Sequence, residues 1–144
     1  MNAENPSTEI DLQAETAPNG NPAMSRTEAS GGQTVLLKNN GSVSLPFDLR
    51  NPGMYKIAVR YSTDGPGVRS EQVDVAVDGK PAGQFEAQNT RTAQQEPGGG
   101  WDSFVTSPSF GPVNLSQDTH TVVVSVGAGD EHGIEIDQVT LTRQ

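Results

Sequence analysis

The segment that decides the fold is residues 51–61, which read NPGMYKIAVRY. Its large apolar residues occupy every second position: Tyr55, Ile57, Val59 and Tyr61. This alternation places one face of a β-strand on a core and leaves the other face to solvent or to a second layer. A Pro-Gly pair precedes the run, and such pairs are typical of turns. The segment therefore predicts a half-buried strand that is entered from a turn.

The same alternation recurs on both sides of this segment. Its apolar positions are Val43, Leu45, Phe47 and Leu49, then Val73, Val75 and Val77, and later Val122, Val124 and Val126. Turn-type residues separate the runs at Asn40-Gly41, Pro52-Gly53, Asp64-Gly65, Asp78-Gly79 and residues 127–133. No window shows sustained helical spacing. Short strands divided by such turns predict an all-β fold, a β-sandwich or barrel of antiparallel strands.

The last run of the chain has an irregular alternation. Ile134 and Ile136 share one parity, whereas Val139 and Leu141 share the other. One extra residue at 137–138, a β-bulge, would bring both pairs to the core. Bulges often redirect a side chain, and the first residue at this bulge is a carboxylate.

The composition limits the classes of function. The chain of 144 residues allows one domain, and its 16 Gly and 10 Pro suit short strands and turns. A net charge of -9 argues against nucleic acid and anionic membranes as partners, because both recruit clustered Lys and Arg. The longest apolar run is too short to span a bilayer. The absence of cysteine excludes disulfides and Cys-ligated zinc.

Residues 1–25 read as a disordered acidic linker or tail. They contain four acidic residues, three prolines, no Lys or Arg and no aromatic residue, so they cannot bury enough apolar surface to offset their ordering entropy. This segment is either a tether to another domain or a remnant of a vector or domain boundary. The sandwich domain is expected over residues 26–144. No signal peptide follows Met1, so we expect the domain to begin inside a longer, processed multidomain chain.

Catalytic motifs are missing from the sequence. It contains no Ser-centred nucleophile elbow, no phosphate-binding loop, no paired His on a helix and no Cys nucleophile. His120 is expected to be a surface residue of a strand, and His132 a solvated residue at a hairpin tip. Two facing carboxylates could form a glycosidase couple, but nothing in the sequence shows that any two converge. We predict that the domain is not an enzyme.

The segment GGGWDSF, residues 98–104, contains the only tryptophan of the chain. Trp101 and Phe104 have opposite strand parity, so in a regular strand one ring faces inward and the other outward. The outward ring could be a platform on which the C–H face of a sugar stacks. Both rings could equally belong to the core, which is the common location of large aromatic residues.

Five segments resemble, in order and spacing, the motifs of carbohydrate-binding modules of families 6 and 35. They are NPGMYKIAVRY at 51–61, VAVDG at 75–79, GGWDSF at 99–104, LSQDTHTVVVSV at 115–126 and IEIDQVTL at 134–141. The resemblance covers about residues 26–143. It implies a jelly-roll β-sandwich of antiparallel strands, joined by a linker to a secreted glycoside-active enzyme.

The resemblance also implies a structural calcium ion. In these families it is held by a carboxylate of the first strand and by the Asp of the last, which correspond to Glu28 and Asp137. Calcium prefers several oxygen ligands, so backbone carbonyls would supply the remainder. The usual Glu-Ala-Glu entry of the family is here Glu28-Ala29-Ser30, which lacks one carboxylate.

The resemblance implies a sugar site at the loop ends of one sheet. The corresponding residues are Tyr61, Asp64, Arg69, Trp101 and Glu135. Trp101 or Tyr61 would stack on the sugar, and Arg69 would donate forked hydrogen bonds. Asp64 and Glu135 would accept hydrogen bonds from hydroxyl groups. Glu135 stands where the family has Asn.

The sequence therefore predicts a non-catalytic carbohydrate-binding module that acts outside the cell or at its surface. The alternative is a structural or adhesive jelly roll that binds a protein partner and has lost its sugar site. An exposed aromatic ring at the loop end would favour the module, and its absence would favour the alternative. A glycosidase would need two carboxylates that face each other across a cleft.

Overall fold

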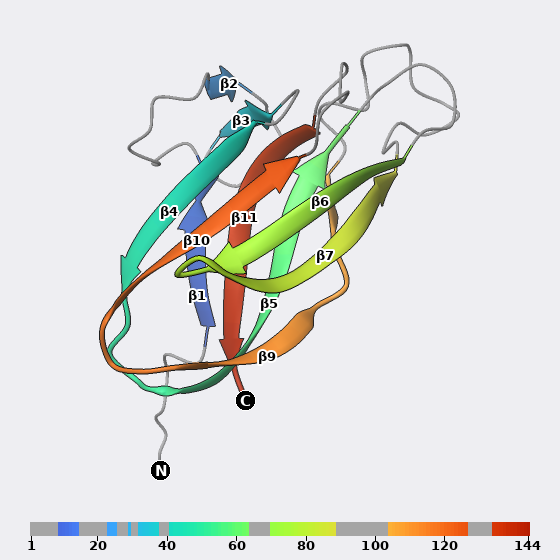
Figure 1. Cartoon of the computed structure of the whole chain (residues 1–144). Helices are drawn as coiled ribbons and strands as arrows, with labels where there is room; N and C mark the ends of the chain where they lie inside the picture. Colours follow the sequence, from blue (N-terminus) through green and yellow to red (C-terminus); the bar gives the residue numbers. More distant parts are fainter. Residues whose placement is uncertain are drawn as a thin grey trace.

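The protein is described by a computed structural model that covers residues 9–14, 23–25, 29, 32–37, 41–63, 70–88, 104–126 and 134–144. These residues form a sandwich of two antiparallel sheets and contain no α-helix (Figure 1). None of the elements in these ranges is a helix long and apolar enough to cross a membrane. The predicted all-β sandwich is confirmed.

The described residues contribute eleven strands. They are β1 (Glu9–Gln13), β2 (Ala23–Ser25), β3 (Gln33–Leu37), β4 (Ser42–Asp48), β5 (Gly53–Ser62), β6 (Ser70–Val77), β7 (Lys80–Gln88), β8 (Val105–Thr106), β9 (Phe110–Leu115), β10 (Thr119–Val126) and β11 (Ile134–Arg143).

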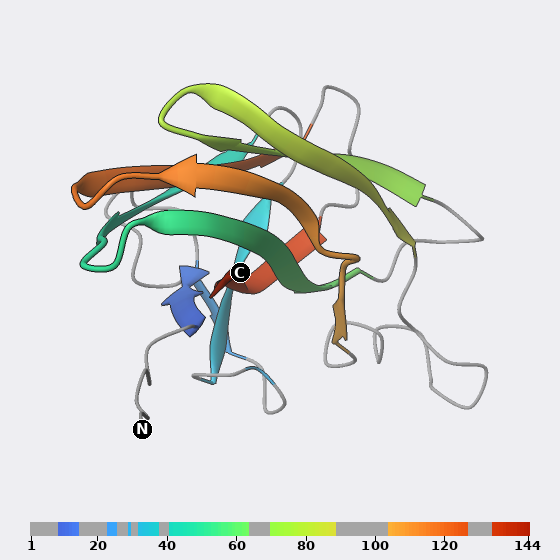
Figure 2. The same cartoon turned by 90° about the horizontal axis from the view of Figure 1, so that it is seen from below.

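The larger sheet has seven strands in the order β2-β3-β11-β5-β8, with β1 paired to β11 and β9 paired to β5. The two long strands β5 and β11 lie at its centre, and each has two short partners along its other edge. The smaller sheet has the order β4-β10-β6-β7. Viewed from below, the layers lie face to face, with β6 and β7 on one side and β1 and β11 on the other (Figure 2).

The core lies between the two sheets and consists of the alternating residues that the sequence predicts. The inward positions of β4, β5, β6 and β10 are all buried. In β5, for example, Tyr55, Ile57 and Val59 have no exposed surface, whereas Lys56 between them is exposed. Period-two alternation therefore sets which face of each strand is removed from water.

The bulge in the last strand is also confirmed. The pairing of β11 with β5 shifts register between Ile136 and Gln138, which leaves Asp137 as the extra residue. With this shift, the residues before the bulge, Ile134 and Ile136, and those after it, Val139 and Leu141, all face the core and are buried.

The β6–β7 turn is the tightest connection of the smaller sheet. Asp78 and Gly79 both have positive φ, 53° and 82°. Two successive residues of this kind form the type I′ turn that suits a two-residue hairpin, and the Asp-Gly pair is among its preferred sequences. The turn fixes the position of the Asp78 side chain at one end of the sandwich.

The N-terminal segment differs from the prediction of a linker over residues 1–25. Residues 9–13 form β1, which pairs with β11 from Glu9↔Thr142 to Gln13↔Gln138. Ala14 is buried, and Ile10 and Leu12 pack against the core. The composition of the whole segment masked this short alternation, in which acidic and apolar residues face opposite sides of one strand.

We therefore expect Leu12→Ala to destabilise the domain by about 2 kcal/mol, because it removes a side chain that packs on the core. Urea unfolding measures the change. Glu9→Ala, at an exposed position of the same strand, is the control and should alter the free energy of unfolding by less than about 0.5 kcal/mol. Equal unfolding curves for Leu12→Ala and the unaltered domain would mean that β1 contributes nothing to the fold.

Candidate functional site

Two residues of the predicted sugar site, Tyr61 and Glu135, lie at the end of the sandwich where β5 and β10 end and β6 and β11 begin; we call this the loop end (Figure 1). Glu28, Asp64, Arg69 and Trp101 lie outside the described residues. So does His132, which the sequence places at a hairpin tip. The described residues of the predicted sites are Tyr61, Glu135 and Asp137, and all three are buried.

Tyr61 is a core residue and does not present its ring to solvent. It is 6% exposed, and its ring lies 5.2 Å from that of Phe85 on β7, centroid to centroid, in a tilted arrangement. The prediction that Tyr61 stacks on a sugar does not fit this position. Its parity is the reason, because Tyr61 continues the inward series of Ile57 and Val59 on β5.

Glu135 is also removed from solvent. It is 1% exposed, although it lies on the opposite face of β11 from the inward Ile134 and Ile136. Thr34 of β3 donates a hydrogen bond of 2.6 Å from its hydroxyl to Oε1 of Glu135. Because the neighbouring strand supplies this partner, Glu135 is part of a buried polar contact between β3 and β11. The sequence predicts that Glu135 is an exposed acceptor for sugar hydroxyls, and its buried position does not fit that prediction.

Asp137, the bulge residue, pairs with a cation from the neighbouring strand. Nη1 of Arg60 on β5 donates to Oδ2 of Asp137, which has no exposed surface. The guanidinium group of Arg60 lies over the ring of Phe104, 4.7 Å from its centroid. A cation on an aromatic face is attracted by the ring quadrupole. The three side chains therefore join β11, β5 and the segment that leads into β8.

The described residues do not fit a calcium site by themselves. Calcium takes about six to eight oxygen ligands, and the described residues contain no group of three or more His, Cys, Asp or Glu side chains that could hold a metal ion. One oxygen of Asp137 already accepts from Arg60. A site would need Glu28 and carbonyl oxygens outside the described residues. The calcium ion therefore stays a prediction.

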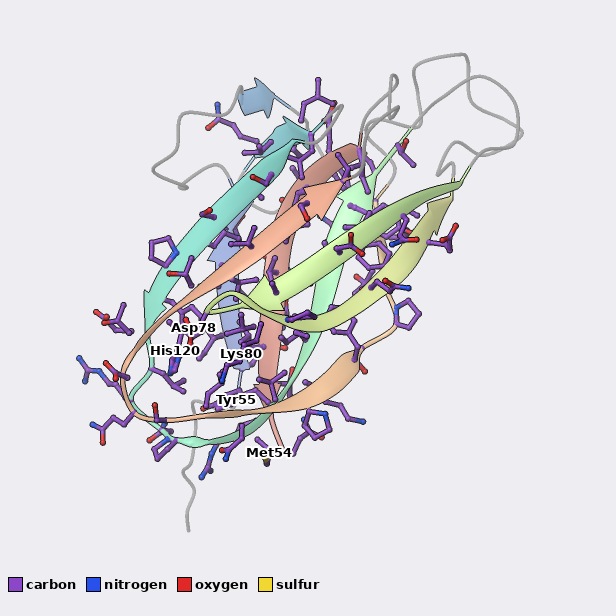
Figure 3. The ribbon with its side chains drawn as sticks, viewed as in Figure 1. Met54, Tyr55, Asp78, Lys80 and His120 are labelled. Carbon is purple, nitrogen blue, oxygen red and sulfur yellow. The ribbon has the colours of Figure 1, made fainter. Side chains whose placement is uncertain are left out.

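The opposite end of the sandwich carries a second polar cluster, centred on Asp78 and His120 (Figure 3). We call it the turn end, because the β6–β7 turn and the β9–β10 connection meet there. His120 is 7% exposed, so the prediction of a surface histidine is wrong. Its ring lies between the turn and Phe47 of β4, 5.8 Å from the Phe47 ring. Strand pairing places it there, because β10 lies between β4 and β6.

Both ring nitrogens of His120 face acceptors. Nδ1 lies 2.6 Å from Oδ2 of Asp78, and Nε2 lies 2.9 Å from the carbonyl oxygen of Ser116. A carboxylate and a carbonyl can only accept, so each nitrogen must carry a proton to make its bond. The geometry therefore favours the imidazolium form. Asp78 also accepts at Oδ1 from the backbone N–H of Thr121, at 2.9 Å.

The electrostatics agree with this assignment. The hydrogen bond from His120 holds the pKa of Asp78 below its usual value, with a further contribution from the Thr121 N–H. Burial alone would lower the pKa of His120. The bonds to Asp78 and Ser116, together with the charges of Asp78 and Asp118, outweigh burial and raise that pKa.

The sequence held a signal for this cluster that residue-by-residue reading missed. VAVDG at 75–79 and the strand that contains His120 are both segments that resemble family motifs. Once β6 and β10 are paired, with Val77 opposite Val122, Asp78 lies beside the start of β10. The contact depends on this pairing, which no single segment reveals.

Comparison with solved structures places the fold among known domains. A family 35 carbohydrate-binding module from Clostridium thermocellum matches 96% of this chain over 100% of its own length, with a TM-score of 0.73 and 16% identity. The C-terminal family 6 module of a marine laminarinase from Zobellia galactanivorans matches 94% of this chain over 99% of its length, with a TM-score of 0.65 and 20% identity. The chain shares the fold of these two modules.

A larger protein contains a similar region. A cycloisomaltooligosaccharide glucanotransferase from Paenibacillus, solved with cycloisomaltoheptaose, matches 93% of this chain over 18% of its own length, with a TM-score of 0.70 and 20% identity. No protein-family model matches the sequence, and no curated protein matches it. The likeness is thus one of fold, and it confirms the jelly-roll sandwich that the five sequence motifs predicted.

The Asp78–His120 pair should make the stability of the fold depend on pH. Because folding raises the pKa of His120, the charged imidazole stabilises the fold fully at pH values below the ordinary pKa of 6.5. This contribution is lost as the pH rises through the pKa that His120 has in the folded protein. Because folding lowers the pKa of Asp78, its carboxylate stabilises the fold at pH values above the ordinary pKa of 3.8. This contribution is lost as the pH falls through the pKa that Asp78 has in the folded protein. Raising the pH from about 6 to about 9 should therefore lower the melting temperature. His120→Asn should flatten this slope, and parallel curves for the two proteins would refute the assignment.

Arg60→Met should destabilise the domain by about 3 kcal/mol, because the buried carboxylate of Asp137 loses its cation. Urea unfolding at neutral pH measures the change. Lys56→Met is the matched control, since Lys56 is an exposed cation on the same strand, and it should change stability little. A similar small effect of both substitutions would show that the Arg60 pair contributes nothing.

The predicted calcium ion is tested in the same unfolding experiments. An ion that binds only the native state stabilises it by about 2.7 kcal/mol at a hundredfold excess over its dissociation constant. Calcium at Asp137 should thus raise the melting temperature relative to excess chelator, and Asp137→Asn should abolish the difference. If the unaltered domain gives the same melting curve with calcium as with excess chelator, the prediction of a calcium ion at this site is wrong.

Proposed function

We propose that this domain is a non-catalytic carbohydrate-binding module that directs a secreted glycoside-active enzyme to its polysaccharide. The observation that carries the proposal is the extent of the fold match. A free-standing family 35 carbohydrate-binding module aligns over its full length with 96% of this chain. Four of the five sequence motifs that resemble families 6 and 35 fall on described strands and turns of this fold, and the fifth, GGWDSF, lies almost wholly outside the described residues.

The proposed sugar site is at the loop end and uses residues outside the described ranges. Trp101 is the stacking ring, and Arg69 and Asp64 bind hydroxyl groups. Stacking suits sugars because their C–H faces are apolar, whereas their hydroxyl groups require directional partners. Residues 64–69 follow β5 after Thr63, and the end of β5 is held by the buried Tyr61 and by the Arg60–Asp137 pair.

The arrangement of the described carboxylates supports a binding role over hydrolysis. Glu135 and Asp137 lie two residues apart on β11 and are bound by Thr34 and Arg60. A glycosidase couple instead faces its substrate from two sides, with carboxyl groups about 5–9.5 Å apart across a cleft. The similar region of the Paenibacillus glucanotransferase, 18% of that chain, supports attachment of the domain to an enzyme.

The test is a glycan array with the purified domain, compared with Trp101→Ala and Met54→Ala variants. Stacking on an aromatic ring is worth about 1–3 kcal/mol per ring in the analogous case of nucleic-acid bases. Trp101→Ala should therefore weaken binding by about ten- to a hundredfold while the melting temperature stays unchanged. Met54 is 41% exposed and lies at the turn end, so its variant should bind normally.

Each other result has a definite meaning. If Trp101→Ala unfolds, the ring belongs to the core and the platform assignment is wrong. If the folded variant binds as well as the unaltered domain, the sugar site lies elsewhere, for instance on the face of a sheet. If the unaltered domain binds no glycan but captures a protein partner, the adhesive alternative replaces the module.

A further inference from the structure

A hollow of about 400 Å³ opens at the turn end, at the opposite end of the sandwich from Tyr61 and Glu135 (Figure 1). It lies between the β6–β7 turn and the end of β9, with the β4–β5 turn at its margin. Small-molecule sites in proteins have volumes of about 300–1,000 Å³ and combine apolar walls with a few polar groups. Figure 3 shows Asp78, His120 and Lys80 close together in this region.

Five polar side chains line the hollow. Asp78, Lys80, Asn114 and Ser116 are exposed, and His120 lies buried behind them. They provide complementary hydrogen-bonding groups: a carboxylate accepts, an ammonium group donates, and an amide and a hydroxyl do both. Around the hollow, the positive charges of Lys80 and His120 are matched by the negative charges of Asp78 and of Asp118, which acts on His120. This balance favours a neutral ligand with several hydroxyl groups over an ion of either sign.

The walls of the hollow are apolar and stiff. They are formed by Pro52, Pro81, Ala82 and Val113. Proline and β-branched residues have few conformations to lose when a ligand binds, so contact with them costs little entropy. Such walls match the C–H faces of a sugar ring, while the rim matches its hydroxyl groups.

Asp78 is held in place before any ligand arrives. Oδ2 accepts from His120, Oδ1 accepts from the Thr121 N–H, and the backbone N–H of Asp78 donates to the Thr121 carbonyl at 2.9 Å. A carboxylate has about four acceptor positions, and the Asp78 side chain remains 44% exposed. Two positions are therefore left for ligand hydroxyls on a group whose orientation is already fixed, which reduces the entropic cost of binding.

From this geometry we infer that the turn-end hollow is a second glycan-binding site, in which Asp78 accepts and Lys80 donates hydrogen bonds to neighbouring hydroxyls of a neutral sugar. The inference rests on the proposed function, because it assigns the same class of ligand to a separate place. The domain would then hold two sugar chains, or two parts of one chain, at opposite ends of the sandwich.

The experiment is a two-dimensional ¹H–¹⁵N NMR titration of the whole chain with β-1,3-galactotriose and, separately, with cellotriose. The backbone amides of Lys80, Asn114 and Ser116 report on the hollow, and those of Thr34 and Glu135 report on the loop end. We expect at least one probe to produce saturable shifts at the three reporters of the hollow.

Two variants test the contacts. Lys80→Met and Asn114→Ala each remove one exposed donor, and a hydrogen bond to a charged group is strong enough that Lys80→Met should weaken binding at the hollow about tenfold. Lys56→Met removes an exposed lysine on the other sheet and should leave affinity unchanged. All three variants should keep the melting temperature of the unaltered domain.

The outcomes separate this inference from the proposed function. Shifts at the hollow that weaken in Lys80→Met support it, whether or not the loop end also responds. Shifts confined to the loop end overturn the second site and leave the module intact. Shifts at neither end with either probe overturn the second site, and silence on the glycan array as well would overturn the module. Equal affinity of Lys80→Met and the unaltered domain at the hollow would refute the assigned contacts.

Discussion

The pairing of β5 with β11 is the interaction on which the rest of the structure depends. These two ten-residue strands lie side by side from Glu135↔Ser62 to Arg143↔Tyr55. Every other strand of the larger sheet attaches to one of them or to a strand that does. One extra residue, Asp137, keeps both halves of β11 facing the core. Without this bulge, one half of the strand would turn its isoleucines or its Val139 and Leu141 to the wrong side.

The bulge also explains why a charged pair lies at the centre of the larger sheet. Asp137 follows the inward Ile136 and so points its side chain away from the core, where this carboxylate is nevertheless fully buried. Burial of such a group requires a counter-charge. Arg60 supplies one from the adjacent strand, and Phe104 in turn supports the guanidinium group. A packing requirement of β11 thus determines the polar chemistry around it.

Much of the fold could be predicted from local alternation, because burial of one face of a strand leaves a direct trace at every second residue. The inward series of β5 and the parity change in β11 are examples.

The positions of the site residues are harder to predict from the sequence than the strands. The resemblance to the family motif points to Tyr61, although the parity of this residue places it in the core. Glu135 points outward, yet Thr34, a hundred positions earlier, meets it across the sheet. His120 meets Asp78 only when β6 and β10 pair. Contacts between distant strands leave no such local trace, and β1 was hidden by the acidic composition around it.

The position of β1 has a mechanical consequence. Glu9 is paired with Thr142, so the chain enters β1 beside the place where it leaves β11. Tension that draws these two points apart acts at the end of the ladder and perpendicular to it. The hydrogen bonds between β1 and β11 are then loaded one after another, which is the unzipping geometry. In the shear geometry, by contrast, they would all be loaded at once. Under load β1 would separate first, while the central β5–β11 pair keeps its contacts.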